Sequence, residues 1–193
     1  MTGGGPAVGR ATVQYPGGLA ARYRWAGTGR GDDVFSMSEG SGRLVDHGDL
    51  GAADPDRACR AELRVEGPLG TWTARFASAI YDEPSGVLWD VPGLLVLKYG
   101  FRAYALDSRT GELRWSFASA TPLVAVLASS RLAHVIVQTE IETNALDASG
   151  EVVWRVAHTD AVAEADLVGG RLVLTGWSGA VQSIDPGTGR PQG

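Results

Sequence analysis

Four potential metal ligands fall within a short stretch of the chain, in the pattern His158-x-Asp160-x-x-x-Glu164-x-Asp166. Imidazole and carboxylate groups are ligands that zinc and manganese take in proteins, and at least three of them must converge on the ion. On an extended strand these four side chains would share one face, but alternate residues stand about 6.6 Å apart. We therefore interpret the group as a solvated acidic strand edge and expect no metal.

Three further carboxylates, those of Asp107, Asp147 and Asp185, recur at equivalent positions along the chain. A calcium site needs about six to eight oxygen ligands gathered around one ion. One carboxylate per repeat does not gather them. We expect these aspartates to be turn residues, because Asp accepts hydrogen bonds from the backbone just ahead of it.

No other pattern in the sequence indicates catalysis. His47 and His134 have no nucleophile at a motif spacing, and the chain contains neither a Gly-x-Ser-x-Gly elbow nor a phosphate-binding loop. The run Gly27-x-Gly29-x-Gly31 is not bracketed by a strand and a helix. We therefore expect a protein without enzymatic activity and without a cofactor.

The elements that would position these residues are indicated by an internal repeat. Gly111, Gly150 and Gly189 each follow the previous one by 39 residues. The surrounding phrase is Ala-Leu-Asp-x-x-Thr-Gly-x-x-x-Trp at 105–115, a close variant at 145–154 ending in Trp154, and a third copy at 183–193 that ends where a tryptophan is due. A period near 40 residues is typical of propeller blades.

Each repeat reads as four strands. The segments 94–107, 134–147 and 172–185 superimpose without a gap, each with an apolar run, a short turn and a second strand. The Asp-x-x-Thr-Gly step predicts a tight turn, and Leu113, Trp115 and Phe117 then alternate with polar residues. Strands at 123–127 and 163–168 complete the blades, with Trp115 and Trp154 expected in equivalent buried places.

The front half lacks the phrase but keeps the strand period of two. Tyr23 and Trp25 alternate with arginines, and apolar residues alternate with charged ones over 59–66. Residues 27–55 are rich in Gly, Ser and Asp and are interpreted as loop, although Asp54-Pro55 could cap a short helix. We divide the chain into a flexible N-terminus (1–10), a divergent antiparallel β region (11–81) and propeller repeats (82–193).

The repeated phrase resembles that of the quinoprotein-like, or pyrroloquinoline-quinone-type, β-propellers, over residues 86–193. In that family the Trp packs between neighbouring blades and the Gly permits the turn. The resemblance implies an all-β fold, a small or incomplete propeller of four-stranded antiparallel blades. Family members include quinone-dependent dehydrogenases, scaffolds and sensor domains. The dehydrogenases are longer and carry paired cysteines, whereas this chain has only Cys59, so we expect no quinone.

Charge and composition exclude some partners. The net charge of −5 falls entirely on residues 82–193, which hold eight basic and thirteen acidic residues. Such a surface repels phosphate backbones, so we expect no nucleic-acid partner. No run of residues is apolar enough to span a membrane, no secretory leader is recognisable, and the single cysteine fits a reducing compartment. We expect a cytoplasmic protein, and a homo-oligomer is possible.

A binding face is predicted where the second and third strands of each blade join. These tips are usually polar, yet here they carry large apolar residues, and the connections between blades emerge on the same side. Clustered exposed aromatics usually mark contact surfaces. The alternative is that these side chains cover their own loops. The predicted binding residues are Tyr99, Phe101, Ile141, Trp177, His158 and Asp160.

The function that these patterns favour is a noncatalytic β-propeller-type interaction or scaffold domain that binds a protein or small ligand on one face. The alternatives are an enzyme or enzyme subunit with a loop-built polar site, and a structural fragment that assembles into a larger ring. The third repeat also predicts an incomplete last sheet, because Pro191 cannot donate a ladder hydrogen bond. Strands 11–15 or 19–25 could complete it, or a second chain could.

Overall fold

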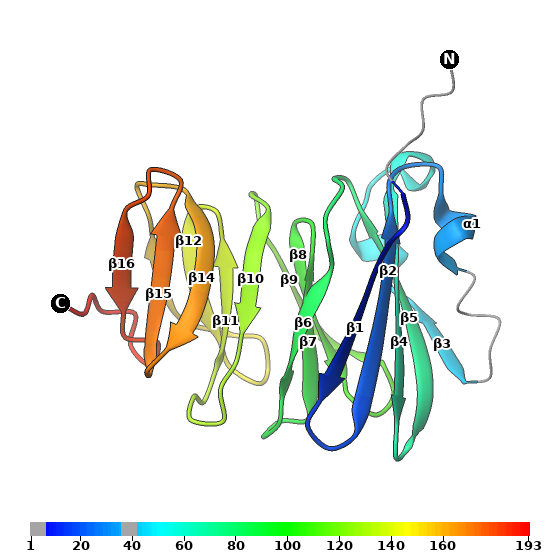
Figure 1. Ribbon diagram of the computed structural model, residues 1–193, viewed down its shortest axis with the longest axis horizontal. Coiled ribbons are helices and arrows are strands. Elements are labelled where there is room, and N and C mark those ends of the chain that lie inside the picture. Colours follow the sequence, from blue (N-terminus) through cyan, green and yellow to red (C-terminus); the bar gives the residue numbers. More distant parts are fainter. Residues whose placement is uncertain (1–6, 36–41) are drawn as a thin grey trace.

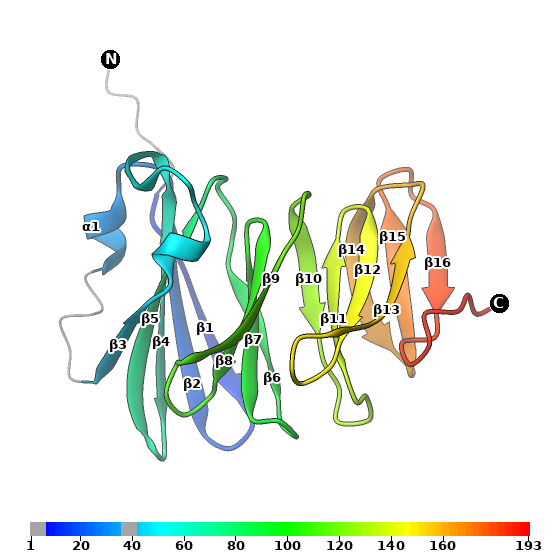
Figure 2. The same ribbon diagram turned by 180° about the vertical axis from the view of Figure 1, so that it is seen from behind.

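Four β-sheets stand side by side along the long axis of the molecule (Figure 1). The computed structural model describes residues 7–35 and 42–193. The first strand of each sheet lies on the side that faces the viewer in Figure 1, and later strands of the sheets face the viewer in Figure 2. Among the described residues no helix is long and apolar enough to cross a membrane.

The first sheet is a blade with an added strand. Its order is β1 (Gly9–Tyr15), β2 (Leu19–Ala26), β4 (Cys59–Gly67), β5 (Gly70–Ser78) and β3 (Arg43–Asp46), and only β3 is parallel to its neighbour. The segment interpreted as loop holds β3 and two single helical turns, α1 (Gly31–Val34) and η2 (Gly48–Leu50). Asp54 does cap a turn, η3 (Pro55–Arg57), by accepting from the Asp56 N–H. The strand pattern resumes at Cys59.

The next three sheets are the repeats. The second consists of β6 (Ser85–Trp89), β7 (Leu94–Tyr99), β8 (Arg102–Asp107) and β9 (Leu113–Ala118), and the third of β10 (Leu123–Leu127), β11 (Val135–Thr139), β12 (Glu142–Leu146) and β13 (Val152–Ala157). The fourth has only β14 (Val162–Val168), β15 (Arg171–Gly176) and β16 (Val181–Ile184). These antiparallel sheets confirm the predicted all-β, incomplete propeller.

The gapless superposition of the third repeat on the first two is wrong by one residue. Leu95 pairs with Leu106 and Val135 pairs with Leu146, so the paired residues are 11 positions apart in both sheets. In the fourth sheet Leu172 pairs with Ile184, which is 12 positions away. The hairpin of the fourth sheet has a longer loop, closed by a hydrogen bond from Gly176 N–H to the Ala180 carbonyl, with Gly179 at φ +84°. A glycine with positive φ is what a three-residue hairpin loop requires.

Three apolar cores fill the spaces between consecutive sheets. Because successive side chains of a strand point to opposite faces, one set of alternate residues packs backward and the other forward. Tyr23, Leu63 and Phe76 of the first sheet meet Leu97 and Leu106 of the second. The second and third cores follow the same arrangement between the remaining sheets. No sheet buries its apolar residues alone.

A tryptophan joins each sheet to the next. A Cβ at Gly150 would lie 2.7 Å from Cγ of Trp115, and one at Gly189 would lie 2.6 Å from Cε3 of Trp154. The predicted equivalence is confirmed, but both indoles are half-buried rather than fully buried. Trp72 in the first sheet lies on Gly111 in the same way, at 2.5 Å from such a Cβ. The divergent front half therefore carries the same linkage as the repeats.

The indole N–H groups complete this linkage in two of the three cases. Trp72 donates to the Ser108 carbonyl at 3.0 Å, and Trp115 donates to the Ala148 carbonyl at 3.1 Å. The indole N–H of Trp154 has no partner among the described residues. The corresponding carbonyl, that of Pro186, instead accepts from Nε2 of His134 at 2.6 Å. His134 is thus a structural residue, with its ring edge-on to Trp154.

The last sheet is not completed by the front strands, so that expectation is wrong. β1 and β2 pair with each other and with β4 in the first sheet, at the opposite end of the stack (Figure 1). They are held there because their apolar side chains belong to the first core. In the described residues the outer edge of β16 meets only an isolated bridge between Ile184 and Pro191 and a bond from Gln192 N–H to the Ser183 carbonyl.

Candidate functional site

The connections at one rim of the stack carry the predicted binding residues. We call this the upper rim; it comprises residues 79–84, 100–101, 119–122, 140–141, 158–161 and 177–180. It is stiffened by backbone hydrogen bonds between hairpins and sheet-to-sheet connections. Leu123 N–H donates to the Gly100 carbonyl at 2.9 Å, and Val162 N–H donates to the Glu140 carbonyl at 2.7 Å. Each tip therefore holds the start of the following sheet.

Trp177 is the most prominent side chain of this rim. It is 73% exposed although it is one of the largest apolar residues of the chain. Its backbone is fixed, since Trp177 N–H donates to the Ala161 carbonyl at 2.8 Å and Gly179 N–H donates to the Gly176 carbonyl at 2.9 Å. The neighbouring Ser178 hydroxyl donates to Asp160. The ring is thus presented to solvent by an ordered loop.

The other predicted tip residues divide into exposed and buried. Ile141 is 44% exposed, and its carbonyl accepts from His158 N–H at 2.8 Å. Phe101 is half-buried. Tyr99 is only 1% exposed and belongs to the first core, so its placement on the binding face is wrong. The reason is the pleat: Tyr99 is the last residue of β7 and points backward, with Leu95 and Leu97.

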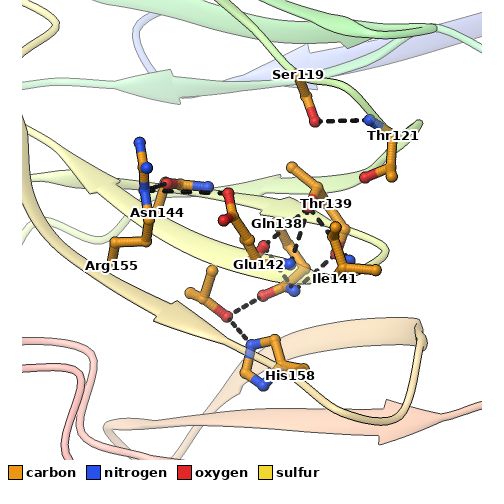
Figure 3. A network of polar contacts seen from close by, with 10 residues as sticks. Ser119, Thr121, Gln138, Thr139, Ile141, Glu142, Asn144, Arg155 and His158 are labelled. Carbon is orange, nitrogen blue, oxygen red and sulfur yellow. Dashed lines mark hydrogen bonds and ion pairs between the residues drawn. The ribbon is translucent and has the colours of Figure 1, made fainter.

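His158 bridges the third and fourth sheets. Its Nε2 is 2.7 Å from the Thr143 hydroxyl and its Nδ1 is 3.1 Å from Nε2 of Gln182. Thr143 in turn donates to Gln138, whose amide donates to the Thr139 and Glu142 carbonyls (Figure 3). Burial lowers the pKa of His158 below its ordinary value, and the nearby Glu142 opposes that shift only partly. The imidazole is therefore neutral at pH 7.

Asp160 is held away from this network. Its carboxylate accepts from Ser178, and it lies against Gly176, where a Cβ would come within 1.9 Å of Oδ2. Ser178 thus donates to a carboxylate rather than to the imidazole of His158. The four potential ligands weighed in the sequence are dispersed, because Glu164 and Asp166 lie on the exposed face of β14. Within residues 7–35 and 42–193 no three His, Cys, Asp or Glu residues are grouped to hold a metal.

The aspartates of the repeated phrase are turn residues. Asp107 accepts from the Arg109 N–H at 2.9 Å and from Arg114, and Asp147 accepts from the Ser149 and Glu151 N–H groups. Burial alone would raise the pKa of Asp107, but the bonds from Arg114 and the backbone outweigh it and lower the pKa. Asp185 likewise accepts from the Gly187 and Thr188 N–H groups.

Sequence reasoning missed two residues with roles at these sites. Tyr81 lies on the upper rim, in the connection from β5 to β6, and is 49% exposed. No repeat phrase marks that connection, so nothing distinguished Tyr81 from a core aromatic. His47 lies within the molecule, with Nε2 3.2 Å from the Gly111 carbonyl. It supports the turn on which Trp72 packs.

The comparisons with known proteins agree with this architecture. Residues 100–192 match the family model described as outer membrane protein assembly factor BamB. The crystal structure of BamB from Moraxella catarrhalis superimposes with a TM-score of 0.53 at 20% identity, covering 97% of this chain and 50% of that chain. The chain therefore spans about half the length of that protein. A comparison with curated protein sequences finds no match.

Two further solved structures are similar to smaller parts of the chain. The WD40 domain of Neurospora crassa Pan2 gives a TM-score of 0.48 at 16% identity, covering 56% of this chain and 36% of that one. A europium-containing methanol dehydrogenase gives 0.43 at 17% identity, with coverages of 51% and 22%. The expected resemblance of the repeats to the quinoprotein-like β-propellers is confirmed by the family model over residues 100–192, and the fold is similar to that of BamB.

Proposed function

We propose that the chain is a noncatalytic interaction domain that binds a protein partner on its upper rim. The observation that carries this proposal is the exposure of Trp177 on an ordered loop. Tryptophan is the residue type most often found to dominate binding energy at interfaces. A ring whose backbone is already fixed loses little conformational freedom on binding.

The surroundings of Trp177 suit a protein surface better than a small molecule. Ile141, at the tip of the adjacent third sheet, adds exposed apolar area on the same rim, and Asp160, Ser178 and His158 add polar groups. An apolar centre with a polar surround is the usual composition of a protein interface. The BamB-like fold supports the same proposal, since the matching family is described as an assembly factor.

The test is a comparison of two matched variants. Trp177→Ala removes the exposed ring of the upper rim, and Leu69→Ala removes an equally exposed apolar side chain, 73% accessible, from the turn between β4 and β5 at the opposite rim. The immobilised wild-type chain captures partners from an extract of its native cell. Affinity for a purified partner is then measured with each variant.

The expected result is a selective loss. A hot-spot tryptophan contributes about 2 kcal/mol or more, so Trp177→Ala should weaken the partner's affinity about 30-fold. Leu69→Ala should leave the affinity unchanged. Equal affinity of the wild type and Trp177→Ala for every captured protein would contradict the proposal.

A further inference from the structure

A cavity opens between the first and second sheets at the lower rim, which is the rim opposite the upper one. Its volume is about 220 Å³, and it lies where the β1–β2, β4–β5 and β8–β9 turns come together. Most of its wall is apolar and is formed by Leu19, Val65, Pro68 and Leu69. The volume equals that of about seven water molecules at about 30 Å³ each. The cavity therefore suits a small organic molecule.

The walls of this cavity are held in place by contacts between the turns. Gly18 has φ +77°, and a Cβ there would lie 3.6 Å from Cγ of Pro68, so the two turns of the first sheet approach each other closely. On the side of the second sheet, the Ser108 carbonyl accepts from the indole N–H of Trp72 at 3.0 Å. A site that is formed before the ligand arrives loses less conformational freedom on binding.

The charge at this cavity is positive and is not neutralised by the chain. Among the described residues that line the cavity, only Arg109 is charged. Its side chain is exposed and forms no ion pair within residues 7–35 and 42–193. The carboxylate of the same turn, that of Asp107, accepts instead from the Arg114 guanidinium and the Arg109 backbone N–H. The Arg109 guanidinium is therefore available to an anion, and its planar fork matches a carboxylate.

A second cavity on the lower rim lacks this combination of apolar wall and single charge. It lies between the third and fourth sheets and has a volume of about 550 Å³. Both Arg131 and Asp185 line it, so it presents both signs of charge. That cavity favours no particular ligand charge, whereas the cavity beside Arg109 favours an anion.

We propose that the cavity between the first and second sheets binds a small apolar carboxylic acid. The hydrocarbon part of the ligand lies against Leu19, Val65 and Leu69, where its burial is favourable. Its carboxylate accepts hydrogen bonds from the guanidinium of Arg109. This inference goes beyond the proposed function, because it uses neither Trp177 nor any other residue of the upper rim.

The experiment is isothermal titration calorimetry of the whole chain at pH 7 with three probes of equal chain length. Octanoate is an anion at this pH, 1-octanol is neutral and octylammonium is a cation. The wild type is expected to bind one octanoate per chain, about tenfold or more tightly than 1-octanol, because hydrogen bonds between two ionised groups are the strong ones. Leu69→Ala should weaken the binding of octanoate and of 1-octanol alike, by about threefold or more, because it removes apolar wall.

Charge variants of Arg109 give the decisive result. Arg109→Gln should lower the affinity for octanoate to that for 1-octanol and leave the affinity for 1-octanol unchanged. Arg109→Glu should reverse the preference in favour of octylammonium, which also demonstrates that this variant is folded. Arg57→Gln is the matched control, since the Arg57 side chain is 87% exposed and lies outside the cavity, and it should bind octanoate as the wild type does.

Four results would overturn the proposal. They are a wild type that shows no saturable binding of octanoate, equal affinity of the wild type for octanoate and 1-octanol, unchanged octanoate binding in Arg109→Gln, and a loss in Arg57→Gln as large as that in Arg109→Gln. The last result would mean that octanoate responds to the overall charge of the chain and not to this cavity.

Discussion

Replacing Gly150 by Ala tests the linkage between sheets most directly. Gly150 has φ +87°, and its added Cβ would stand 2.7 Å from Cγ of Trp115. A non-glycine residue in the left-handed region costs about 1–2 kcal/mol, and overpacking costs about 1–3 kcal/mol more. We therefore expect Gly150→Ala to lower the free energy of unfolding by about 2–5 kcal/mol. Urea denaturation followed by circular dichroism measures this directly.

The matched control separates backbone strain from contact with the ring. Gly93 also has a positive φ, +68°, but a Cβ there would meet nothing within 4 Å. Gly93→Ala should therefore cost only the backbone term, about 1–2 kcal/mol. In a Trp115→Ala background the Gly150→Ala change should fall to the same range, because two substitutions that share a contact are not additive. Equal costs for Gly150→Ala and Gly93→Ala in the wild-type background would refute the packing argument.

Three other outcomes follow from the described contacts. Trp72→Ala should cost about 3–5 kcal/mol and Trp154→Ala less, as measured by urea denaturation, because Trp72 is 1% exposed and donates a hydrogen bond whereas Trp154 is half-buried and does not. The folded state lowers the pKa of His158 below 6.5. The contribution of His158 to stability should therefore be complete above pH 6.5 and decrease as the pH falls through the lower folded pKa. The free energy of unfolding, measured across this pH range, should decrease less in His158→Gln than in the wild type. Lys98→Met leaves Asp82 without the ammonium group that lies 2.9 Å from both its oxygens and should cost about 3–5 kcal/mol in the same assay, with partial recovery when Asp82→Asn is added.

The repeat phrase was sufficient to predict the architecture of the second half. The Asp and Gly of each turn and the Trp that follows are local in sequence, so their spacing reveals the strands between them. Trp72 could not be recognised in the same way. Its turn partner Gly111 belongs to the next sheet, and no Asp-x-x-Thr-Gly step precedes Trp72 in the first. Only the three-dimensional stacking identifies the first sheet as a blade.

The exposure of the candidate rim residues was predicted in part. Trp177 and Ile141 lie at hairpin tips, where a short loop leaves little backbone to cover them. Tyr99 is one residue inside its strand, and the pleat alone turns it into the core. One residue of difference in hairpin length also displaced the third repeat by a register step, since a shift of one residue exchanges the two faces of a strand. Loop length of this kind is not encoded in the apolar pattern.

The Trp-on-Gly linkage also runs in one direction along the stack, from the N-terminal sheet to the C-terminal sheet, which is the order in which the sheets are synthesised. Each indole packs on a turn that is translated later than the indole itself. Trp72 packs on Gly111, Trp115 on Gly150 and Trp154 on Gly189. As the chain emerges from the ribosome, the newest complete sheet always exposes an apolar face and an unsatisfied ring. Each later sheet covers the one before it. Premature termination after the first, second or third sheet therefore leaves a product with an exposed apolar face. Such a face makes incomplete chains recognisable to chaperones and proteases.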